Sequence, residues 1–268
     1  MQDRYVETVL GRIRLRIDGS GAAMLFWPSL LMDGTLWSAQ AEHFARRFQV
    51  ILVDPPGHGG SALLTKPFSF AECAQVVLQI VDNLGVDKVH LIGNSWGGMI
   101  GGTFAALHPD RTGRAVLMNA AASPAGRRQR FEYGVLTRSA QLLGGIRGPL
   151  TRPVLGAFLG PTAIREKPDV VAKVNELVHQ VNVRSGMHAV TSVVPRRPDQ
   201  RALFRAIRTP VLVVAGAEDQ TFPVAETKQM TDVIPGARFV VLERSAHLAA
   251  LESPKEVNAL IDDFFADH

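Results

Sequence analysis

The feature that most constrains the fold of this chain is the pentapeptide Gly93-Asn94-Ser95-Trp96-Gly97, which fits the pattern G-x-S-x-G. Residues 88–93 form a short apolar run typical of a buried strand, and residues 99–108 form a helical pattern that stops at Pro109. A serine at a sharp turn from strand to helix needs strained backbone geometry, and the flanking glycines leave room for the turn. The pattern therefore predicts that Ser95 is an exposed catalytic nucleophile.

Apolar runs and amphipathic helical patterns alternate along most of the chain. The runs predicted as strands are residues 5–10, 12–17, 22–27, 50–53, 88–93, 114–119, 210–215 and 238–242. The predicted helices are residues 36–48, 70–84 and 99–108, with two more starting near residues 224 and 254. This succession predicts an α/β fold with a mainly parallel eight-stranded sheet that helices cover on both faces.

Residues 121–205 interrupt this alternation, because they contain several helical patterns and no convincing strand. We interpret them as a helical cap inserted after the sixth strand, with residues 1–120 and 206–268 forming the core. Such an insertion usually covers the active site and shapes the substrate pocket. Position in the chain suggests five pocket-wall residues, although core packing explains each of them equally well: Phe158, Met187, Val190, Phe222 and Leu248.

A nucleophilic serine requires a base that takes its proton, and the base requires a group that orients it. His247 follows the last predicted strand, at the same carboxyl edge of the sheet as Ser95, and is the predicted base. His58, in the loop of residues 54–61, is the alternative base, although its Pro-Gly-His-Gly setting favours a turn. The other histidines lie in predicted helices, at a strand start or at the chain end: His43, His90, His108, His179, His188 and His268.

The predicted acid is Asp219, which follows the strand of residues 210–215. The chain order Ser95, Asp219, His247 is the order that this architecture requires. Glu218 is the neighbouring alternative. A second position for an acid follows the sixth strand, but Asn119 stands there and cannot carry the charge.

A tetrahedral intermediate also requires donors for its oxyanion. The backbone N–H of Trp96, directly after the nucleophile, is the first predicted donor. The second is the backbone N–H of Leu30, in the loop after the strand that ends at Trp27. We also expect the Trp96 indole to form part of the pocket wall, where it could bind substrate.

These motifs, together with the loop Asp54-Pro55-Pro56-Gly57-His58-Gly59-Gly60-Ser61, resemble the α/β-hydrolase superfamily over essentially the whole chain. The loop Pro28-Ser29-Leu30 is similar to the Asn-Ser-Leu version of 3-oxoadipate enol-lactonases, although Pro28 differs. The resemblance implies a serine esterase or lactonase that works through an acyl-enzyme and needs no cofactor. The sharp turn from strand to helix that carries Ser95 is called the nucleophile elbow. Serine at this elbow argues against a haloalkane dehalogenase or an epoxide hydrolase, because those relatives use aspartate there.

Two other classes of function remain open at this point. The same triad also serves C–C bond hydrolysis of a diketone, a lyase or a perhydrolase activity. A non-catalytic ligand receptor built on the fold is the third alternative, but a receptor has no need of an activated serine.

Composition and charge limit the possible partners. The single cysteine, Cys73, rules out an internal disulfide and a cysteine-based metal cluster, and we predict no metal site. No apolar run approaches about 18 residues and the amino terminus lacks signal-peptide features, so we expect a cytoplasmic protein with no membrane partner. The sequence gives no indication of oligomeric state.

The net charge is +4, and thirteen arginines crowd residues 127–208. No nucleic-acid recognition motif or aromatic interleaving accompanies them, so we expect no nucleic-acid partner. They form either a solvated face or a field that attracts anionic substrates. The expected partner is a small ester or lactone that can be anionic.

Overall fold

The computed structural model of the chain describes residues 1–266; His268, for which no catalytic role is predicted, lies outside this range. Its centre is one eight-stranded sheet with the order β1-β2-β4-β3-β5-β6-β7-β8. The first two strands pair antiparallel at one edge, β2 also runs antiparallel to β4, and β3 to β8 are parallel. The strands are β1 (Gln2–Thr8), β2 (Gly11–Asp18), β3 (Ala23–Trp27), β4 (Gln49–Val53), β5 (Val89–Asn94), β6 (Thr112–Met118), β7 (Val211–Gly216) and β8 (Arg238–Leu242). The predicted mainly parallel eight-stranded sheet is confirmed.

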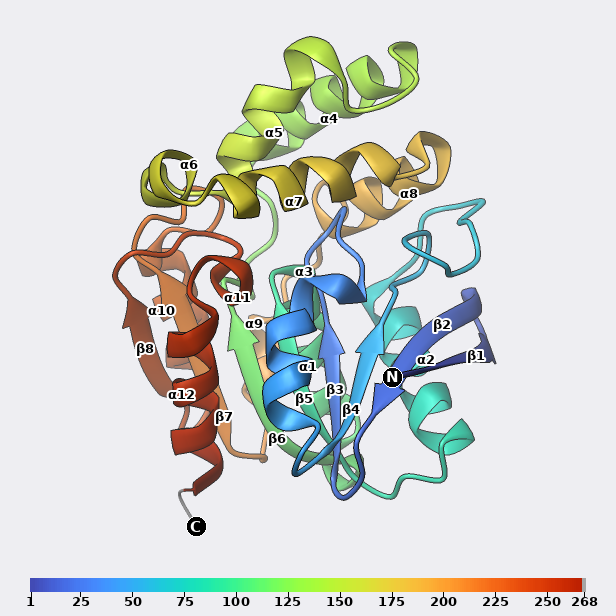
Figure 1. Cartoon of the computed structure of the whole chain (residues 1–268), viewed down its shortest axis with the longest axis vertical. Coiled ribbons are helices and arrows are strands. Elements are labelled where there is room, and N and C mark those ends of the chain that lie inside the picture. The colour runs from blue at the N-terminus through green and yellow to red at the C-terminus, as the bar shows by residue number, and fades with distance from the viewer. Residues whose placement is uncertain (267–268) are drawn as a thin grey trace.

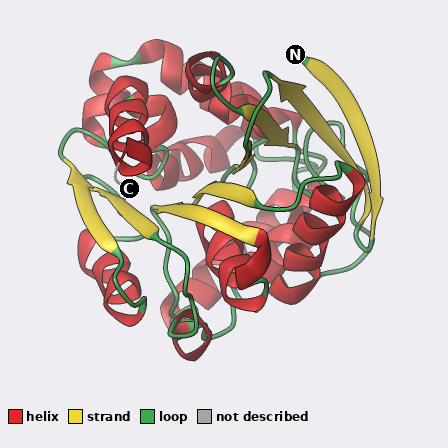
Figure 2. Cartoon of the chain, turned by 90° about the horizontal axis from the view of Figure 1, so that it is seen from below, coloured by secondary structure: helices red, strands yellow, loops and turns green. Residues whose placement is uncertain are grey.

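Helices cover both faces of this sheet, as the view along its strands shows (Figure 2). In Figure 1, α1 and α12 lie in front of the sheet and α2 lies behind it, where it packs on α3. The helices outside residues 121–205 are η1 (Gly34–Trp37), α1 (Ser38–Phe44), α2 (Phe70–Asn83), α3 (Trp96–Leu107), η2 (Pro109–Arg111), α10 (Val224–Val233), α11 (Ala249–Glu252) and α12 (Pro254–Ala266). The helix predicted over residues 36–48 is thus shorter and begins as a 3₁₀ turn.

Local sequence signals account for the best-defined of these elements. The Ser69 hydroxyl accepts a hydrogen bond from the Glu72 N–H while the Glu72 carboxylate accepts one from the Ser69 N–H, which confirms the predicted capping box of α2. Strand β7 is buried along its whole length, as expected of a central parallel strand with helices on both faces. Cys73, on the inner face of α2, is fully buried.

The region between β6 and β7 is helical throughout and contains no strand among the described residues. Its elements are α4 (Arg127–Leu142), η3 (Gly148–Leu150), α5 (Thr151–Phe158), α6 (Pro161–Glu166), α7 (Pro168–Gln180), α8 (Val183–Val193) and α9 (Arg201–Phe204). Figure 1 shows α4 to α8 stacked above the carboxyl ends of the parallel strands. The last element differs, because the buried Phe204 of α9 meets Gly102 of α3 and so packs on the core.

Strand register brings the catalytic candidates to one edge of the sheet. Gly93 at the end of β5 is level with Trp27 of β3 on one side and with Leu117 of β6 on the other. The loops that follow these strands therefore emerge side by side beneath the helices α4 to α8 (Figure 1).

Candidate active site

Ser95 occupies a strained turn between β5 and α3. Its φ of 56° and ψ of −111° lie in a region that residues with a side chain rarely adopt. A Cβ atom added to Gly93 would lie 2.1 Å from the Gly97 carbonyl oxygen, and one added to Gly97 would lie 2.0 Å from the Trp27 carbonyl oxygen. Glycine is therefore required at both positions, and this steric requirement explains the two glycines of the G-x-S-x-G pattern.

Asp219 and His247 meet at the carboxyl edge of the sheet. The Nδ1 atom of His247 lies 2.9 Å from Oδ2 of Asp219, and both side chains are buried. The other carboxylate oxygen of Asp219 accepts the N–H groups of Thr221 (2.8 Å) and Phe222 (3.0 Å). Each oxygen thus has its own donor, and the carboxylate is fixed in the orientation that holds the imidazole.

The neighbouring acid, Glu218, has a different contact. Its carboxylate accepts the N–H of Thr162 at 2.9 Å and the Thr162 hydroxyl at 2.5 Å. Glu218 therefore ties the start of α6 to the loop after β7, and the structure does not bring it to the His247 ring.

Ser95 and His247 open onto one cavity of about 310 Å³ between the carboxyl edge of the sheet and the helices α4, α5 and α8. Phe158 and Phe222 flank the imidazole, with ring centroids 5.9 and 5.6 Å from it. Within residues 1–266 no hydrogen bond joins the Ser95 hydroxyl to His247. Such contacts are often long in unliganded hydrolytic enzymes and shorten when substrate binds.

Four of the predicted wall residues, Phe158, Met187, Val190 and Phe222, line this cavity together with Leu30. The structure does not place Trp96 and Leu248 in its wall, and the expectation for these two side chains needs correction. The Trp96 indole is fully buried and stacks on Phe68, with the centroids 5.5 Å apart. Leu248 is also fully buried. Each directly follows a candidate catalytic residue in the chain, but adjacency does not fix the direction of a side chain.

Sequence reasoning missed the contribution of α4 to the cavity. One face of this helix supplies six wall residues: Gln129, Glu132, Tyr133, Leu136, Thr137 and Ala140. Their spacing of three and four residues is the signal that could have indicated a common face. Arg197, from the segment after α8, is a further wall residue that was not singled out.

Asn119 connects the three loops that carry the candidate residues. Its Nδ2 donates to the carbonyl oxygen of His247 at 2.8 Å and to Oδ1 of Asn94 at 3.2 Å. Its Oδ1 accepts the N–H of Gly216 at 2.8 Å, at the start of the loop that leads to Asp219. The position that could have held an acid instead holds an amide that both donates and accepts.

Glu252 accepts hydrogen bonds from the backbone on both sides of His247. Its Oε1 accepts the N–H groups of Ala246 and Leu248, each at 3.1 Å, and its Oε2 faces the N–H of Gly160 at 3.4 Å. Burial of this side chain raises its pKa to about 6, against the lowering effect of the three N–H groups and of His247. The loop that carries His247 is therefore held partly by a carboxyl group whose pKa is about 6.

Glu252→Gln should flatten the pH dependence of stability between about pH 4.5 and 6. The folded pKa lies above the ordinary 4.5, so the stability from this group is complete below that value and is lost as pH rises through 6. Urea unfolding at acidic and neutral pH should show the wild type losing about 2 kcal/mol relative to the variant. The same pH dependence in both proteins would contradict this assignment.

His58 supports the neighbouring loop and does not line the cavity. Its Nε2 accepts the N–H of Leu31 at 3.1 Å, its Nδ1 donates to the carbonyl oxygen of Pro56 at 3.0 Å, and Leu31 has a positive φ of 63°. Burial lowers the pKa of His58, which keeps the ring neutral and able to accept this hydrogen bond. The predicted alternative base is thus engaged with the loop that carries Leu30.

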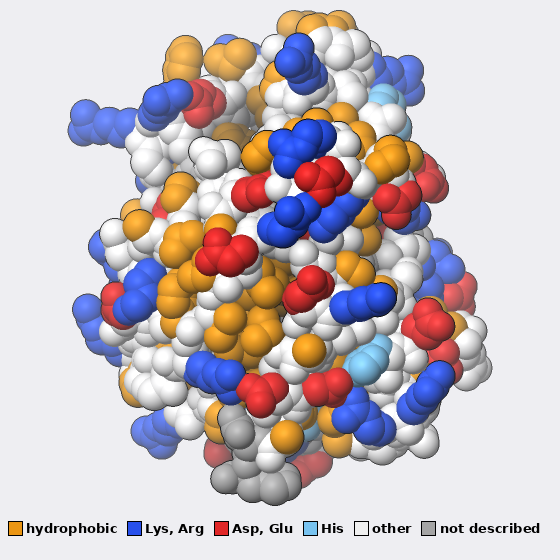
Figure 3. Space-filling view, turned by 60° about the vertical axis from the view of Figure 1, so that its left-hand side comes forward, with side chains coloured by type: hydrophobic (Ala, Val, Ile, Leu, Met, Phe, Trp, Pro, Cys, Tyr) orange, Lys and Arg blue, Asp and Glu red, His pale blue; other side chains and the backbone are white. Residues whose placement is uncertain are grey.

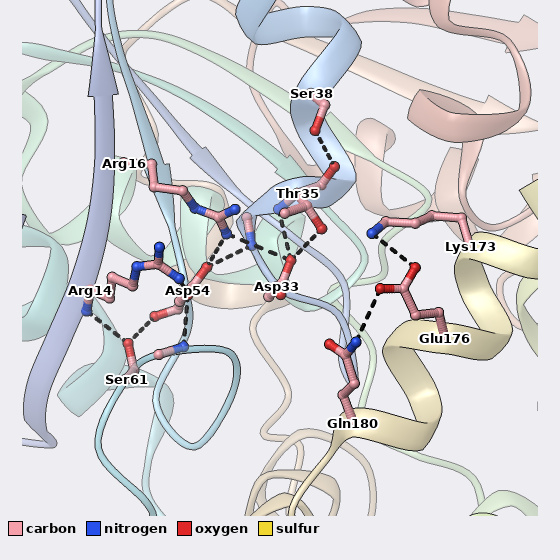
Figure 4. Close-up of polar contacts among 12 residues, drawn as sticks. Arg14, Arg16, Asp33, Thr35, Ser38, Asp54, Ser61, Lys173, Glu176 and Gln180 are labelled. Carbon is pink, nitrogen blue, oxygen red and sulfur yellow. Dashed lines mark hydrogen bonds and ion pairs between the residues drawn. The ribbon is translucent and has the colours of Figure 1, made fainter. Parts of the chain in front are cut away.

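A charged cluster holds the His58 loop in place (Figure 4). The fully buried Asp54 lies 2.5 Å from Nη2 of Arg16 and 3.6 Å from Nη1 of Arg14. Its carboxylate also accepts the N–H groups of Gly34 (3.0 Å) and Gly60 (2.8 Å). Asp54 therefore ties the loop of residues 54–61 to the segment that follows Leu31.

No group of three or more His, Cys, Asp and Glu side chains in residues 1–266 is arranged to hold a metal ion. In the same range, no helix is both long enough and apolar enough to span a bilayer.

A family model described as alpha/beta hydrolase fold matches residues 22–254. The chain belongs to this α/β hydrolase family. The fold, the elbow and the acid and histidine after β7 and β8 agree with that membership, which confirms the resemblance noted in the sequence.

Individual α/β hydrolases are similar over nearly the whole chain. The 3-oxoadipate enol-lactonase 2 of Acinetobacter baylyi is 27% identical over 90% of this chain and 87% of its own length. A 2-hydroxy-6-oxononadienedioate/2-hydroxy-6-oxononatrienedioate hydrolase of Paraburkholderia phymatum is 28% identical over 97% of this chain and 89% of its own. The solved structure of a thermophilic esterase from Thermogutta terrifontis with malate bound superposes with a TM-score of 0.90, at 25% identity, covering 99% and 98% of the two chains. The chain is therefore a hydrolase of this family.

Proposed function

We propose that this α/β hydrolase cleaves a carboxylic ester or lactone through an acyl-enzyme on Ser95. The observation that carries the proposal is the pairing of His247 with Asp219 at 2.9 Å beside a strained serine that opens onto the same cavity. A non-catalytic receptor has no use for a strained serine, a buried carboxylate and an oriented imidazole in one place.

In the proposed mechanism the Ser95 hydroxyl attacks the acyl carbon while His247 takes its proton. Asp219 holds the imidazole in the required tautomer and stabilises its charged form. Collapse of the tetrahedral intermediate breaks the C–O bond, and His247 gives the proton to the leaving oxygen. Water then attacks the acyl-enzyme with His247 again as base, which releases the acid and restores the serine.

The N–H groups of Leu30 and Trp96 are the proposed donors to the oxyanion. Trp96 is the first residue of α3, where a helical N–H has no intrahelical acceptor. The Leu30 N–H has no acceptor among the protein atoms of residues 1–266, and Leu30 lines the cavity beside Ser95. Both donors are thus free to meet the charge that develops on the substrate.

His58→Leu should lower kcat for an ester by about 10-fold to 100-fold with little change in KM, because a displaced oxyanion donor affects the transition state most. His58→Gln should restore part of the loss, since its amide oxygen can accept the Leu31 N–H. Steady-state kinetics of the two variants, with thermal unfolding as a check of the fold, measures this. Equal losses in both variants would count against a role for this hydrogen bond.

The cavity supports a substrate with an apolar body and a negative charge. Its wall is mostly apolar, and among residues 1–266 Arg197 is the one arginine that lines it. The guanidinium is buried, with Nε donating to the Ser123 carbonyl oxygen at 2.8 Å and with the nearest carboxylate, Glu226, 3.9 Å away. Its Nη1 has no acceptor among the described protein atoms. The names of two relatives, an enol-lactonase of 3-oxoadipate and a hydrolase of a nonadienedioate, also denote carboxylates.

Arg197→Gln should raise KM for a monoester of a dicarboxylic acid by about 10-fold to 100-fold, because a hydrogen bond between charged groups is lost. The KM for a neutral ester of the same length should stay unchanged. Arg196→Gln, an exposed arginine next to it, is the matched control and should affect neither substrate. Equal effects of Arg197→Gln on both substrates would show that the arginine only maintains the structure.

We also propose that residues 121–205 act as the cap that shapes this cavity over a core of residues 1–120 and 206–268. The cavity wall supports this division, since α4, α5 and α8 supply most of it. The packing of Phe204 on Gly102 supports a return to the core close to the proposed boundary.

C–C bond hydrolysis of a diketone is the second candidate, because one relative covering 97% of the chain is named as such a hydrolase. One experiment separates ester or lactone hydrolysis from C–C bond hydrolysis. The purified enzyme is incubated in turn with a p-nitrophenyl ester, a lactone and a vinylogous diketone acid, and the products of each reaction are identified. Our proposal predicts ester or lactone turnover that exceeds C–C cleavage by at least about 100-fold in kcat/KM. Faster C–C cleavage would replace our proposal by the second candidate.

A further inference from the structure

The outer face of α4 carries a cluster of exposed apolar side chains. Ten large apolar side chains are exposed among residues 1–266, and four of them lie within or directly after this helix. Two have the highest exposures of all, Leu142 at 88% and Phe131 at 73%. Phe131, Val135 and Leu142 follow one another at helical spacing, so they share a face opposite the one that lines the cavity.

Arginines surround these side chains. We define the α4 patch as these eight residues: Arg127, Arg128, Arg130, Phe131, Val135, Arg138, Leu142 and Leu143. All of them are exposed. Figure 3, in which the cap lies at the top, shows basic side chains projecting beside hydrophobic ones on one side of this region.

The charge of the segment around the patch exceeds that of the whole protein. Residues 121–152 contain six arginines, one glutamate and no lysine or aspartate, a net charge of +5. The whole chain carries +4, so all other residues together sum to −1. The single acid, Glu132, is paired with Arg128 at 2.7 Å.

We propose that the α4 patch docks on an anionic lipid surface. Arginines attract anionic headgroups, and protruding phenylalanine and leucine side chains insert between headgroups and acyl chains. This charge disfavours a second copy of the chain on the same face, because two patches with four arginines each repel each other. Binding of this kind needs no membrane-spanning helix. It departs from the expectation of no membrane partner, which rested on the lack of a long apolar run and of signal-peptide features.

The proposed lipid contact lies directly over the cavity that contains Ser95. The inner face of α4 forms one wall of the cavity that contains Ser95, while its outer face carries the patch. When the protein is docked, α4 would therefore lie between the cavity and the lipid surface. The patch residues do not line the cavity, so they can be changed without altering its wall.

Vesicle flotation of the full chain tests the proposal. The probes are vesicles of phosphatidylcholine alone and vesicles with about one third phosphatidylglycerol. The wild type should bind the anionic vesicles and not the neutral ones. Arg127→Gln/Arg128→Gln/Arg138→Gln should lower the partition coefficient by about 100-fold, since each arginine near such a surface contributes about a five-fold factor. Phe131→Ser/Leu142→Ser should lower it by about 10-fold or more.

Two matched variants control for net charge and exposed apolar area. Arg46→Gln/Arg205→Gln/Arg208→Gln removes the same charge from exposed positions elsewhere, and Leu63→Ser/Ile164→Ser removes two exposed apolar side chains outside the patch. Both should bind as the wild type does. All variants should hydrolyse a soluble ester at the wild-type rate, which confirms that they fold.

Three results would overturn the proposal. The first is no binding of the wild type to anionic vesicles. The second is an equal loss in the patch and control variants, which would reduce the effect to net charge. The third is capture by immobilised heparin as strong as that by vesicles and unaffected by Phe131→Ser/Leu142→Ser, which would indicate a soluble polyanion as the partner.

Discussion

Ser95→Ala should lower kcat/KM for a p-nitrophenyl ester by about 10³-fold to 10⁶-fold, because the variant lacks the oxygen that forms the proposed acyl-enzyme. Residual turnover would come from the backbone donors alone. The measurement is steady-state hydrolysis, with the wild-type enzyme concentration fixed by active-site titration. Thermal unfolding should show a folded variant, since alanine requires no more space than serine at this turn.

Ser38→Ala, an exposed serine at the start of α1, is the control for this variant. It should retain full activity. Turnover by Ser95→Ala within about tenfold of the wild type would mean that the ester is cleaved by another group, such as a water molecule activated directly by His247.

Asp219→Asn should lower kcat by about 10⁴-fold while leaving KM within a few-fold. The amide can still accept the N–H groups of Thr221 and Phe222, so the loop should keep its position. Its remaining group then faces the His247 ring without the charge that stabilises the imidazolium, and it can favour the wrong tautomer. The measurement is kcat as a function of pH on the same ester.

Glu218→Gln is the matched variant for this prediction, because it removes a carboxylate from the adjacent residue. Glu218 contacts Thr162 of α6 and not the imidazole. Its loss should therefore cost about tenfold or less, through looser packing of α6. A loss in Glu218→Gln as large as that in Asp219→Asn would reverse the assignment of the acid.

The fold was predictable from the sequence because its signals are local. Residues 88–108 contain a strand, a glycine-bounded serine and a helix, and the structure has β5, Ser95 and α3 there. The capping box of Ser69 and Glu72 marks the start of α2 in the same way. Chain order then placed Asp219 and His247 in the loops after β7 and β8, and parallel strands bring such loops to one edge.

The cavity wall was less predictable, because it depends on how the helices of residues 121–205 pack over the sheet. Phe158 and Phe222 line the cavity beside His247, whereas Trp96 is buried against Phe68. The direction of an apolar side chain next to a catalytic residue depends on neighbours that are distant in the chain, and no local pattern encodes them. Arg197 shows the same limit: one of thirteen arginines in its region, it is distinguished only by its burial in the cavity.

The most direct test of the account is to label the enzyme with a serine-directed phosphonate and to map the adduct by mass spectrometry of peptides. We expect one adduct per chain on Ser95, no adduct in Ser95→Ala and much slower labelling of His247→Ala. An adduct on another residue, or continued ester turnover by enzyme that is not labelled at Ser95, would contradict it.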